Sequence, residues 1–280
     1  AGQEKVAFVT REAGSGKTSL LQTFARQAQK QHPRLIPLFG SCQAHIGPGN
    51  PYLPFRMIMT HALGDIEPLW RSGIFSRAQV DRLWHLRQTA VALLRDVAPD
   101  CLAALVDTFL LPEDLRPTAV AKAAPQEILF LQMTHFLQQF SQHGPLLLLL
   151  DDLHWADSGS IDLLFYLQRQ LAGYPILLLG TYRQEALLPV PPGENQHPLV
   201  QLIHELTSNF GDIEVALNRA DGREFVDAWL DTEPNHLGES FRQTLFRQTQ
   251  GHALFTVELV ADMQESGELW RDPKRHSQVW

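Results

Sequence analysis

Cysteine, positive charge and long apolar runs are scarce in this sequence of 280 residues, and each absence excludes a class of protein. The two cysteines, Cys42 and Cys101, lie far apart, which excludes a disulfide framework or C-x-x-C metal site and favours a reducing, cytoplasmic setting. The formal net charge is −8, so we expect this segment to make no direct contact with nucleic acid. The run Leu146–Leu150 is far shorter than the roughly 20 apolar residues that cross a bilayer. No charged-then-apolar signal opens the chain, and we expect a soluble protein without membrane contact.

Hydrophobic residues make up 44% of the chain and recur in patterns typical of an α/β protein. Short segments that are apolar on both faces predict five strands of a buried parallel sheet. These segments are residues 6–10, 35–40, 146–150, 176–181 and 213–217. Between the second and third strands, repeated helical spacing predicts a long helical insertion at about 43–124. Glycine and proline predict an exposed loop at its entry, residues 46–54, and another between Pro112 and Pro117.

The remaining segments predict a helical region behind the sheet. A helix begins near Pro125, and a proline-rich crossing spans residues 188–198. From Asp221, the expected cap of a first helix, the pattern is purely helical. Two further helices are predicted, one at 237–248 that stops at Gly251 and one at 254–266 that stops at Gly267. We therefore predict a sheet domain at 1–218 and a helical lid at 219–280. We also expect the whole chain to be a segment of a longer polypeptide.

A nucleotide-phosphate loop is predicted directly behind the first strand. The string Ala13-Gly14-Ser15-Gly16-Lys17-Thr18 ends the pattern G-x-x-x-x-G-K-[ST], followed by Ser19 and a helical pattern. Its glycines let backbone N–H groups face phosphate oxygens, Lys17 can reach the β and γ phosphates, and the Thr18 hydroxyl can bind Mg²⁺. The alternative is a simple glycine-rich turn, but the order of strand, loop and helix favours nucleotide binding by residues 13–19.

Arg11 stands where that pattern has its first glycine. A side chain at this point must find room beside the phosphates. Arg11 would either block the site or swing outward and add a positive charge near the anion. The sequence leaves both outcomes open.

Two carboxylates, Asp151 and Asp152, follow the most apolar strand. The carboxyl ends of strands in open α/β sheets are where ligands bind. Asp151 is therefore expected to hold Mg²⁺ opposite Thr18, and Asp152 to orient or deprotonate an attacking water. The alternative is that the pair only caps the next turn.

The residues of the turn after the acidic pair are expected to have structural roles. His154 and Trp155 are expected to pack the turn after the acidic pair, and Asp157 or Ser158 to cap the next helix.

Arg183, in Gly180-Thr181-Tyr182-Arg183 at the end of the fourth strand, would lie beside the γ phosphate, unless it is only a surface arginine. Asp152, Lys17 and Arg183 are thus the predicted catalytic residues.

Three strings together carry a family resemblance: Asp-Asp-Leu-His-Trp-Ala-Asp from Asp151, Gly-Thr-Tyr-Arg from Gly180, and Gly-His-Ala-Leu-Phe-Thr-Val-Glu-Leu from Gly251. The chain resembles the signal-transduction ATPases with numerous domains (STAND), which carry the AAA ATPase domain of type 16. This resemblance implies a three-layer P-loop NTPase sandwich with strand order 5-1-4-3-2, a helical lid and a following winged helix. By the same motifs, Lys17 and Thr18 match the phosphate-loop pair, the two aspartates the acidic pair and Arg183 the strand-end sensor.

The sequence departs from that family at Arg11 and at His252-Ala253, where the family commonly has Asn-Pro, and it lacks the usual upstream Gly-Arg-Glu segment. The resemblance implies a regulatory switch with ATP or ADP and Mg²⁺, fused to DNA-binding, cyclase, kinase or sensor regions. We expect a slowly hydrolysing ATPase module whose partners are ATP and other domains of the same polypeptide, with self-association left open. The rival hypothesis is a scaffold of the same fold that does not bind nucleotide. A phosphotransferase is disfavoured because no acceptor-substrate site or basic lid cluster is visible.

Overall fold

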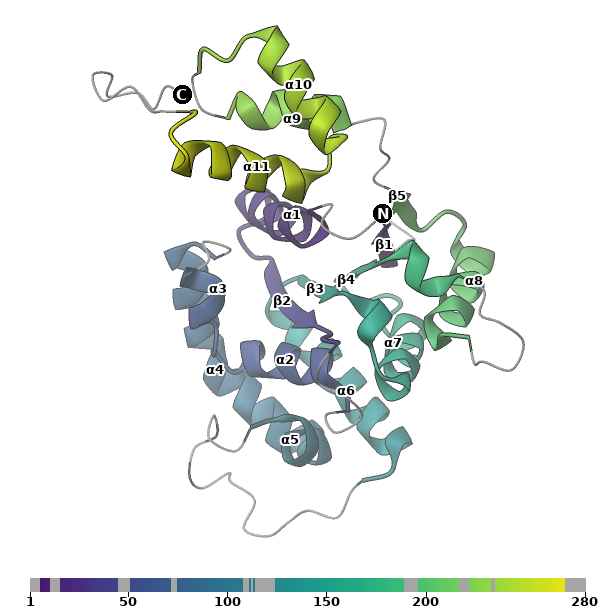
Figure 1. Cartoon of the computed structure of the whole chain (residues 1–280). Coiled ribbons are helices and arrows are strands. Elements are labelled where there is room, and N and C mark those ends of the chain that lie inside the picture. The colour runs from purple at the N-terminus through teal and green to yellow at the C-terminus, as the bar shows by residue number, and fades with distance from the viewer. Residues whose placement is uncertain are drawn as a thin grey trace. The chain divides into compact units, whose positions relative to one another are not determined.

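The structure, a computed structural model, describes residues 6–10, 16–44, 51–71, 75–107, 111, 113, 124–188, 196–216, 222–232 and 235–269 (Figure 1). The chain falls into two compact units. The first comprises Ala1–Val9 and Thr18–Val215, and the second comprises Thr10–Lys17 and Ala216–Trp280. Within the described ranges, no helix has both the length and the apolar character needed to cross a membrane.

A five-stranded parallel sheet runs through the first unit. Its strands are β1 (Val6–Thr10), β2 (Ile36–Ser41), β3 (Leu146–Asp151), β4 (Ile176–Tyr182) and β5 (Glu214–Ala216). Their order is β2-β3-β4-β1-β5, which confirms the predicted order 5-1-4-3-2. Leu146 pairs with Ile36 on one side and with Ile176 on the other, so β3 is a central strand. The strands lie within a residue or two of their predicted positions, and Leu217, the last residue predicted for β5, lies outside the described residues.

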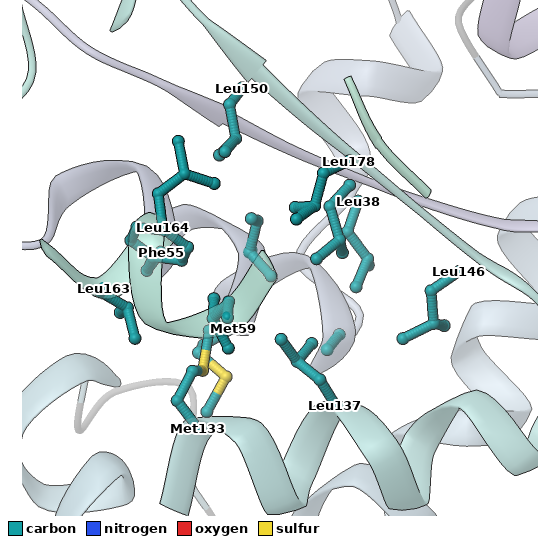
Figure 2. Close-up of a cluster of buried hydrophobic side chains, with 14 of the residues drawn as sticks. Leu38, Phe55, Met59, Met133, Leu137, Leu146, Leu150, Leu163, Leu164 and Leu178 are labelled. Atoms are coloured by element: carbon teal, nitrogen blue, oxygen red, sulfur yellow. The ribbon is translucent and has the colours of Figure 1, made fainter. Parts of the chain in front are cut away.

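Alternate side chains of β3 face opposite sides of this sheet, as the two-residue repeat of a strand requires. Leu146, Leu148 and Leu150 belong to the large core, whose central side chains are drawn in Figure 2. That core includes side chains from α2 (Leu53–Ala62), α6 (Gln126–Phe140) and α7 (Ser158–Gln170). On the other face, Phe24 and Ala28 of α1 (Lys17–Gln31) line a groove with Leu147 and Leu177. Helices thus cover both faces, as predicted for a three-layer sandwich.

The long insertion between β2 and β3 is helical, as predicted. It contains α2, α3 (Glu67–Arg71), α4 (Arg77–Val97) and α5 (Pro99–Leu105). The predicted entry loop ends earlier than expected, because α2 begins at Leu53 with Pro54 in its first turn. A Cβ atom built at Gly40 of β2 would lie 2.3 Å from the carbonyl oxygen of Pro54, so a glycine is needed where this helix crosses the strand. The predicted loop between Pro112 and Pro117 lies largely outside the described residues.

Short connections and one helix complete the first unit. After α6, which begins beside Pro125 as predicted, come the 3-10 helices η3 (Ser141–His143), η4 (Leu153–Trp155) and η5 (Gln184–Leu187). No helix was predicted between the fourth and fifth strands, but α8 (Pro198–Phe210) lies there. It buries Leu199, Leu202, Ile203 and Leu206. Their spacing is helical, and Pro198 is a first-turn residue. The sequence therefore contains a helical pattern directly after the proline-rich crossing.

The second unit contains α9 (Gly222–Leu230), α10 (Glu239–Thr249) and α11 (Ala253–Glu265), near their predicted positions. Its small core contains Val226, Leu230, Leu245 and Val260. Gly251 and Gly267, predicted as helix stops, have φ angles of 70° and 79° and follow α10 and α11. His252 caps α11, because its Nδ1 accepts a hydrogen bond from the Phe255 N–H at 3.5 Å. The predicted cap Asp221 lies outside the described residues.

Candidate functional site

The start of α1 carries the described part of the predicted phosphate loop. Gly16 has a φ angle of 83°, a left-handed conformation that glycine adopts without strain. Lys17 and Thr18 are the first two residues of α1, and Lys17 is only 6% exposed although it carries a charge. Ser19 lies in the same first turn and is exposed. Arg11, Ala13, Gly14 and Ser15 lie outside the described residues.

Asp151 ends β3 and connects three elements at the carboxyl edge of the sheet. The Thr18 hydroxyl donates a hydrogen bond to Asp151 Oδ2 at 2.5 Å. The Thr181 hydroxyl, from the end of β4, donates to Asp151 Oδ1 at 2.5 Å. Two residues predicted to share a metal ion, 133 positions apart in sequence, therefore lie in direct contact.

Thr181 is a residue to which sequence reasoning gave no role. Its side chain is fully buried, and its hydroxyl oxygen also accepts a hydrogen bond from the Asp152 N–H at 2.9 Å. It therefore links β4 to the backbone of one aspartate and to the carboxylate of the other. The sequence feature that could have identified Thr181 is a hydroxyl side chain near the carboxyl end of the fourth strand, the strand that pairs with the one ending in the acidic pair.

Asp152 adopts a backbone conformation that is uncommon outside glycine. Its φ angle is 56°, and its N–H donates to both Asp151 Oδ1, at 3.1 Å, and Thr181 Oγ1. The Asp152 side chain is 32% exposed and does not cap the turn η4 that follows it. The capping alternative for this residue is therefore wrong.

Asp157, in contrast, is a cap, as predicted. Its carboxylate accepts hydrogen bonds from the Ser160 N–H at 2.9 Å and the Ser160 hydroxyl at 2.5 Å, at the start of α7. It also accepts from the Tyr52 N–H at 3.2 Å, next to α2. Its role is structural, since one carboxylate joins the starts of two helices.

The turn between these carboxylates holds one buried and one exposed ring. His154 is buried as expected, and its Nδ1 lies 3.8 Å from Asp152 Oδ1. Trp155 was also expected to pack the turn, but it is 47% exposed. It lines a cavity of about 610 Å³ together with Cys42 and Tyr52. The Trp155 and His154 rings are in contact at a tilt, with centroids 5.1 Å apart.

Negative charge gathers at this edge of the sheet. The pKa of Cys42, just beyond β2, is raised to about 12, mainly because the thiol is buried. The negative charges of Asp157, Asp152 and Asp151 raise it further, which shows that all three carboxylates lie near this thiol. Carboxylates near one another repel, and this repulsion favours a bound cation. The described residues contain no cluster of three or more histidine, cysteine, aspartate or glutamate side chains that could hold a metal alone.

The donor set at this edge is of the kind that Mg²⁺ prefers. A hydroxyl and a carboxylate oxygen, from Thr18 and Asp151, meet at 2.5 Å, and Mg²⁺ commonly takes one or two protein oxygens with phosphates and waters. Arg183 follows β4 and is half-buried. Its Nε is buried and has no hydrogen-bond partner within the part of the chain that the structure describes.

Comparisons with known proteins agree with this geometry. An uncharacterized protein of Rhizobium meliloti (strain 1021) is 29% identical over 188 residues, which are 65% of this chain and 16% of that protein. The chain thus matches a small part of a much longer relative. The model of the family described as AAA ATPase domain matches residues 1–179, well over half of the chain, from the phosphate loop into the first half of β4. The chain therefore belongs to the AAA ATPase domain family, and it is a P-loop module of the nucleotide-binding kind.

Proposed function

We propose that this chain is an ATP-binding, slowly hydrolysing switch module of a larger signalling or transcription-regulating protein. The observation that carries the proposal is the direct contact of Thr18 with Asp151, which joins the start of α1 to the end of β3. In P-loop NTPases, a hydroxyl and a carboxylate in these positions hold the Mg²⁺ of the nucleotide. Slow turnover suits a switch, since the bound state must persist long enough to be read.

Each predicted site residue has a role in this proposal. Residues 13–19 bind the phosphates, and Lys17 neutralises the charge on the β and γ phosphates. Thr18 and Asp151 hold Mg²⁺, which supplies further positive charge to the phosphates when bound. Asp152, with its partly exposed carboxylate, orients the attacking water and accepts its proton. Arg183 offers its guanidinium to the γ phosphate.

The multidomain setting is supported by the length of the Rhizobium meliloti relative, most of which lies outside the match. We propose that the sheet domain extends over residues 1–218 and that residues 219–280 form a helical domain that responds to the nucleotide. Its partners are then the other domains of the same polypeptide. ATP and ADP would differ in the arrangement that they stabilise, because a ligand shifts an equilibrium only through unequal affinity for two states.

Arg11 favours a second candidate, a scaffold of the same fold that does not bind nucleotide. A Mg·ATP titration of the wild-type chain, Arg11→Gly and Lys17→Ala separates the two. The switch proposal predicts binding by wild type and Arg11→Gly, and none by Lys17→Ala. Binding by Arg11→Gly alone would support the scaffold.

Hydrolysis is tested separately from binding. With the full chain, Asp152→Asn is expected to keep Mg·ATP affinity within about twofold while the rate of phosphate release falls about a hundredfold or more, since a general base is lost. Glu185→Gln, just beyond Arg183 and exposed, is a matched control that should leave the rate unchanged. Loss of ATP binding in Asp152→Asn would contradict the role assigned to this carboxylate.

A further inference from the structure

The cavity of about 610 Å³ beside the turn η4 has no role in the proposed function. It lies between three elements of the first unit: Cys42 follows β2, Leu53 begins α2 and Ser158 begins α7. None of the residues proposed to bind phosphate or Mg²⁺ is among the described residues that line it. On the described part of the chain, the cavity is therefore separate from the proposed nucleotide site.

Two aromatic side chains line this cavity. Trp155, in η4, is 47% exposed, so much of its indole surface is open to a ligand. The Tyr52 ring is held in place, because it packs edge-on against Phe130 with centroids 6.2 Å apart. It also lies so close to Gly159 that a Cβ atom there would be 3.0 Å from its Cε1. The face of an aromatic ring attracts a cation, and tryptophan does so most strongly.

The charge near the cavity is negative. Asp157 is the one charged side chain among the described residues that line it. Burial raises the pKa of the Tyr52 phenol, and the negative charges of Asp157 and Asp162 raise it further. The Cys42 thiol likewise lies near Asp157 and Asp152. Several carboxylates therefore lie near the cavity, where they would repel an anionic ligand and attract a cationic one.

The hydrogen-bonding capacity of the Asp157 carboxylate is largely used. It accepts from the Ser160 N–H at 2.9 Å, from the Ser160 hydroxyl at 2.5 Å and from the Tyr52 N–H at 3.2 Å. A carboxylate has about four acceptor positions, so three bonds leave its charge but few free lone pairs. A guanidinium, which binds best through two parallel hydrogen bonds, is poorly served here. A cation without N–H groups loses nothing.

We propose that this cavity binds the quaternary ammonium group of a small free molecule, over the Trp155 and Tyr52 rings and beside the Asp157 carboxylate. Choline is a convenient representative of this class. Its charge is covered by methyl groups, so apolar walls such as Leu53 and Pro54 leave no hydrogen-bonding group of the ammonium unsatisfied. The inference goes beyond the proposed function, since it needs neither ATP nor Mg²⁺.

The test is a titration of the full chain with choline in the absence of nucleotide, followed through the NMR signal of the choline methyl groups. An analogue in which carbon replaces the choline nitrogen has nearly the same shape and no charge. We expect the Kd of choline to be about tenfold lower than that of the carbon analogue, or lower still, because only choline gains the attraction to the rings and the carboxylates.

Substitutions locate the binding site. Trp155→Ala is expected to weaken choline binding about tenfold, and Trp155→Phe less, since it keeps a ring. Trp84→Ala is the matched control, because Trp84 of α4 is 52% exposed and is not among the described residues that line the cavity. It should leave the Kd for choline unchanged, and circular dichroism would confirm that the variants are folded. Lys17→Ala should also bind choline as wild type does, whatever its affinity for ATP.

Four results would overturn the proposal. Wild type that does not bind choline removes it outright, and a carbon analogue that binds as tightly as choline would show a merely apolar cavity. The same Kd for Trp155→Ala and Trp84→Ala would place choline elsewhere on the protein. Binding to phosphatidylcholine vesicles without binding of free choline would identify a lipid surface in place of a small molecule.

Discussion

At the scale of single residues, the carboxyl edge of the sheet depends on one hydroxyl. Thr181 Oγ1 donates to Asp151 and accepts from the Asp152 N–H, so its removal takes one hydrogen bond from each of these two groups. We predict that Thr181→Val lowers the free energy of unfolding by about 1–3 kcal/mol. It should also slow ATP hydrolysis by about tenfold, because the acidic pair loses its fixed geometry.

Thr181→Ser is the matched control for this prediction, since it keeps the hydroxyl and loses only a methyl group. Denaturant unfolding and steady-state phosphate release would be measured for both variants. If serine proved as damaging as valine, the hydroxyl bridge would not be the cause.

A second residue sets how stability depends on pH. His61 is buried in α2, and its Nδ1 accepts a hydrogen bond from the Phe39 N–H of β2 at 3.3 Å. Burial lowers the pKa of His61 from 6.5 to about 4. As the pH falls, the unfolded chain takes up the proton first, so the stability is complete above about pH 6.5 and is lost towards about pH 4.

We predict that this one histidine removes about 3 kcal/mol of stability over that range. His61→Asn keeps an acceptor near Nδ1 and cannot titrate. The difference between wild type and variant in the free energy of unfolding should therefore change by that amount between neutral pH and about pH 4. A difference that stays constant with pH would show that His61 does not stay neutral in the folded chain.

Residue types alone were enough to single out Thr18, Asp151 and Asp152, because their chemistry is specific and a motif surrounds them. They were not enough for Thr181. A threonine in a strand is usually a packing residue, and only its contacts to two aspartates distinguish this one. The exposure of Trp155 was missed for the same reason, since an aromatic ring is expected to be buried.

At the scale of elements, the crossing of α2 over β2 depends on Gly40. A Cβ atom there would lie 2.3 Å from the carbonyl oxygen of Pro54, and backbone cannot move aside as a flexible side chain can. We predict that Gly40→Ala lowers the free energy of unfolding by about 1–3 kcal/mol by forcing the helix off the strand.

Ser41→Ala, one residue along the same strand, provides the comparison for Gly40→Ala, since it adds no atoms. Denaturant unfolding of both variants measures the effect. Equal stability of the two would mean that α2 does not approach β2 as closely as the structure has it.

The elements with strong patterns were the predictable ones. The apolar run of β3 identified a central strand, and Pro125 marked the start of α6. The helix α8 was missed because the prolines before it read as a surface crossing, although its four buried side chains have helical spacing. Three residues of β5 lie in the part of the chain that the structure describes, too few for a periodic pattern to fix where the strand begins.

At the scale of the whole molecule, the order of the strands is the feature that places the site. Placing β3 and β4 side by side brings Asp151 and Thr181 together. Local patterns cannot give that order, because they say nothing about which strands pair. It was predicted from the family resemblance and then confirmed. How the second unit responds to nucleotide stays a prediction, since it depends on a change between two states.

The proposed function requires a magnesium-dependent nucleotide site at Thr18 and Asp151. The most direct test is the Kd of the full chain for ATP, measured by calorimetry with Mg²⁺ and with excess chelator, for wild type and for Asp151→Asn. We predict that Mg²⁺ tightens ATP binding by wild type by about tenfold or more, and that Asp151→Asn removes most of this difference. Absence of ATP binding by wild type, or an equal effect of Mg²⁺ on both proteins, would contradict the proposed function.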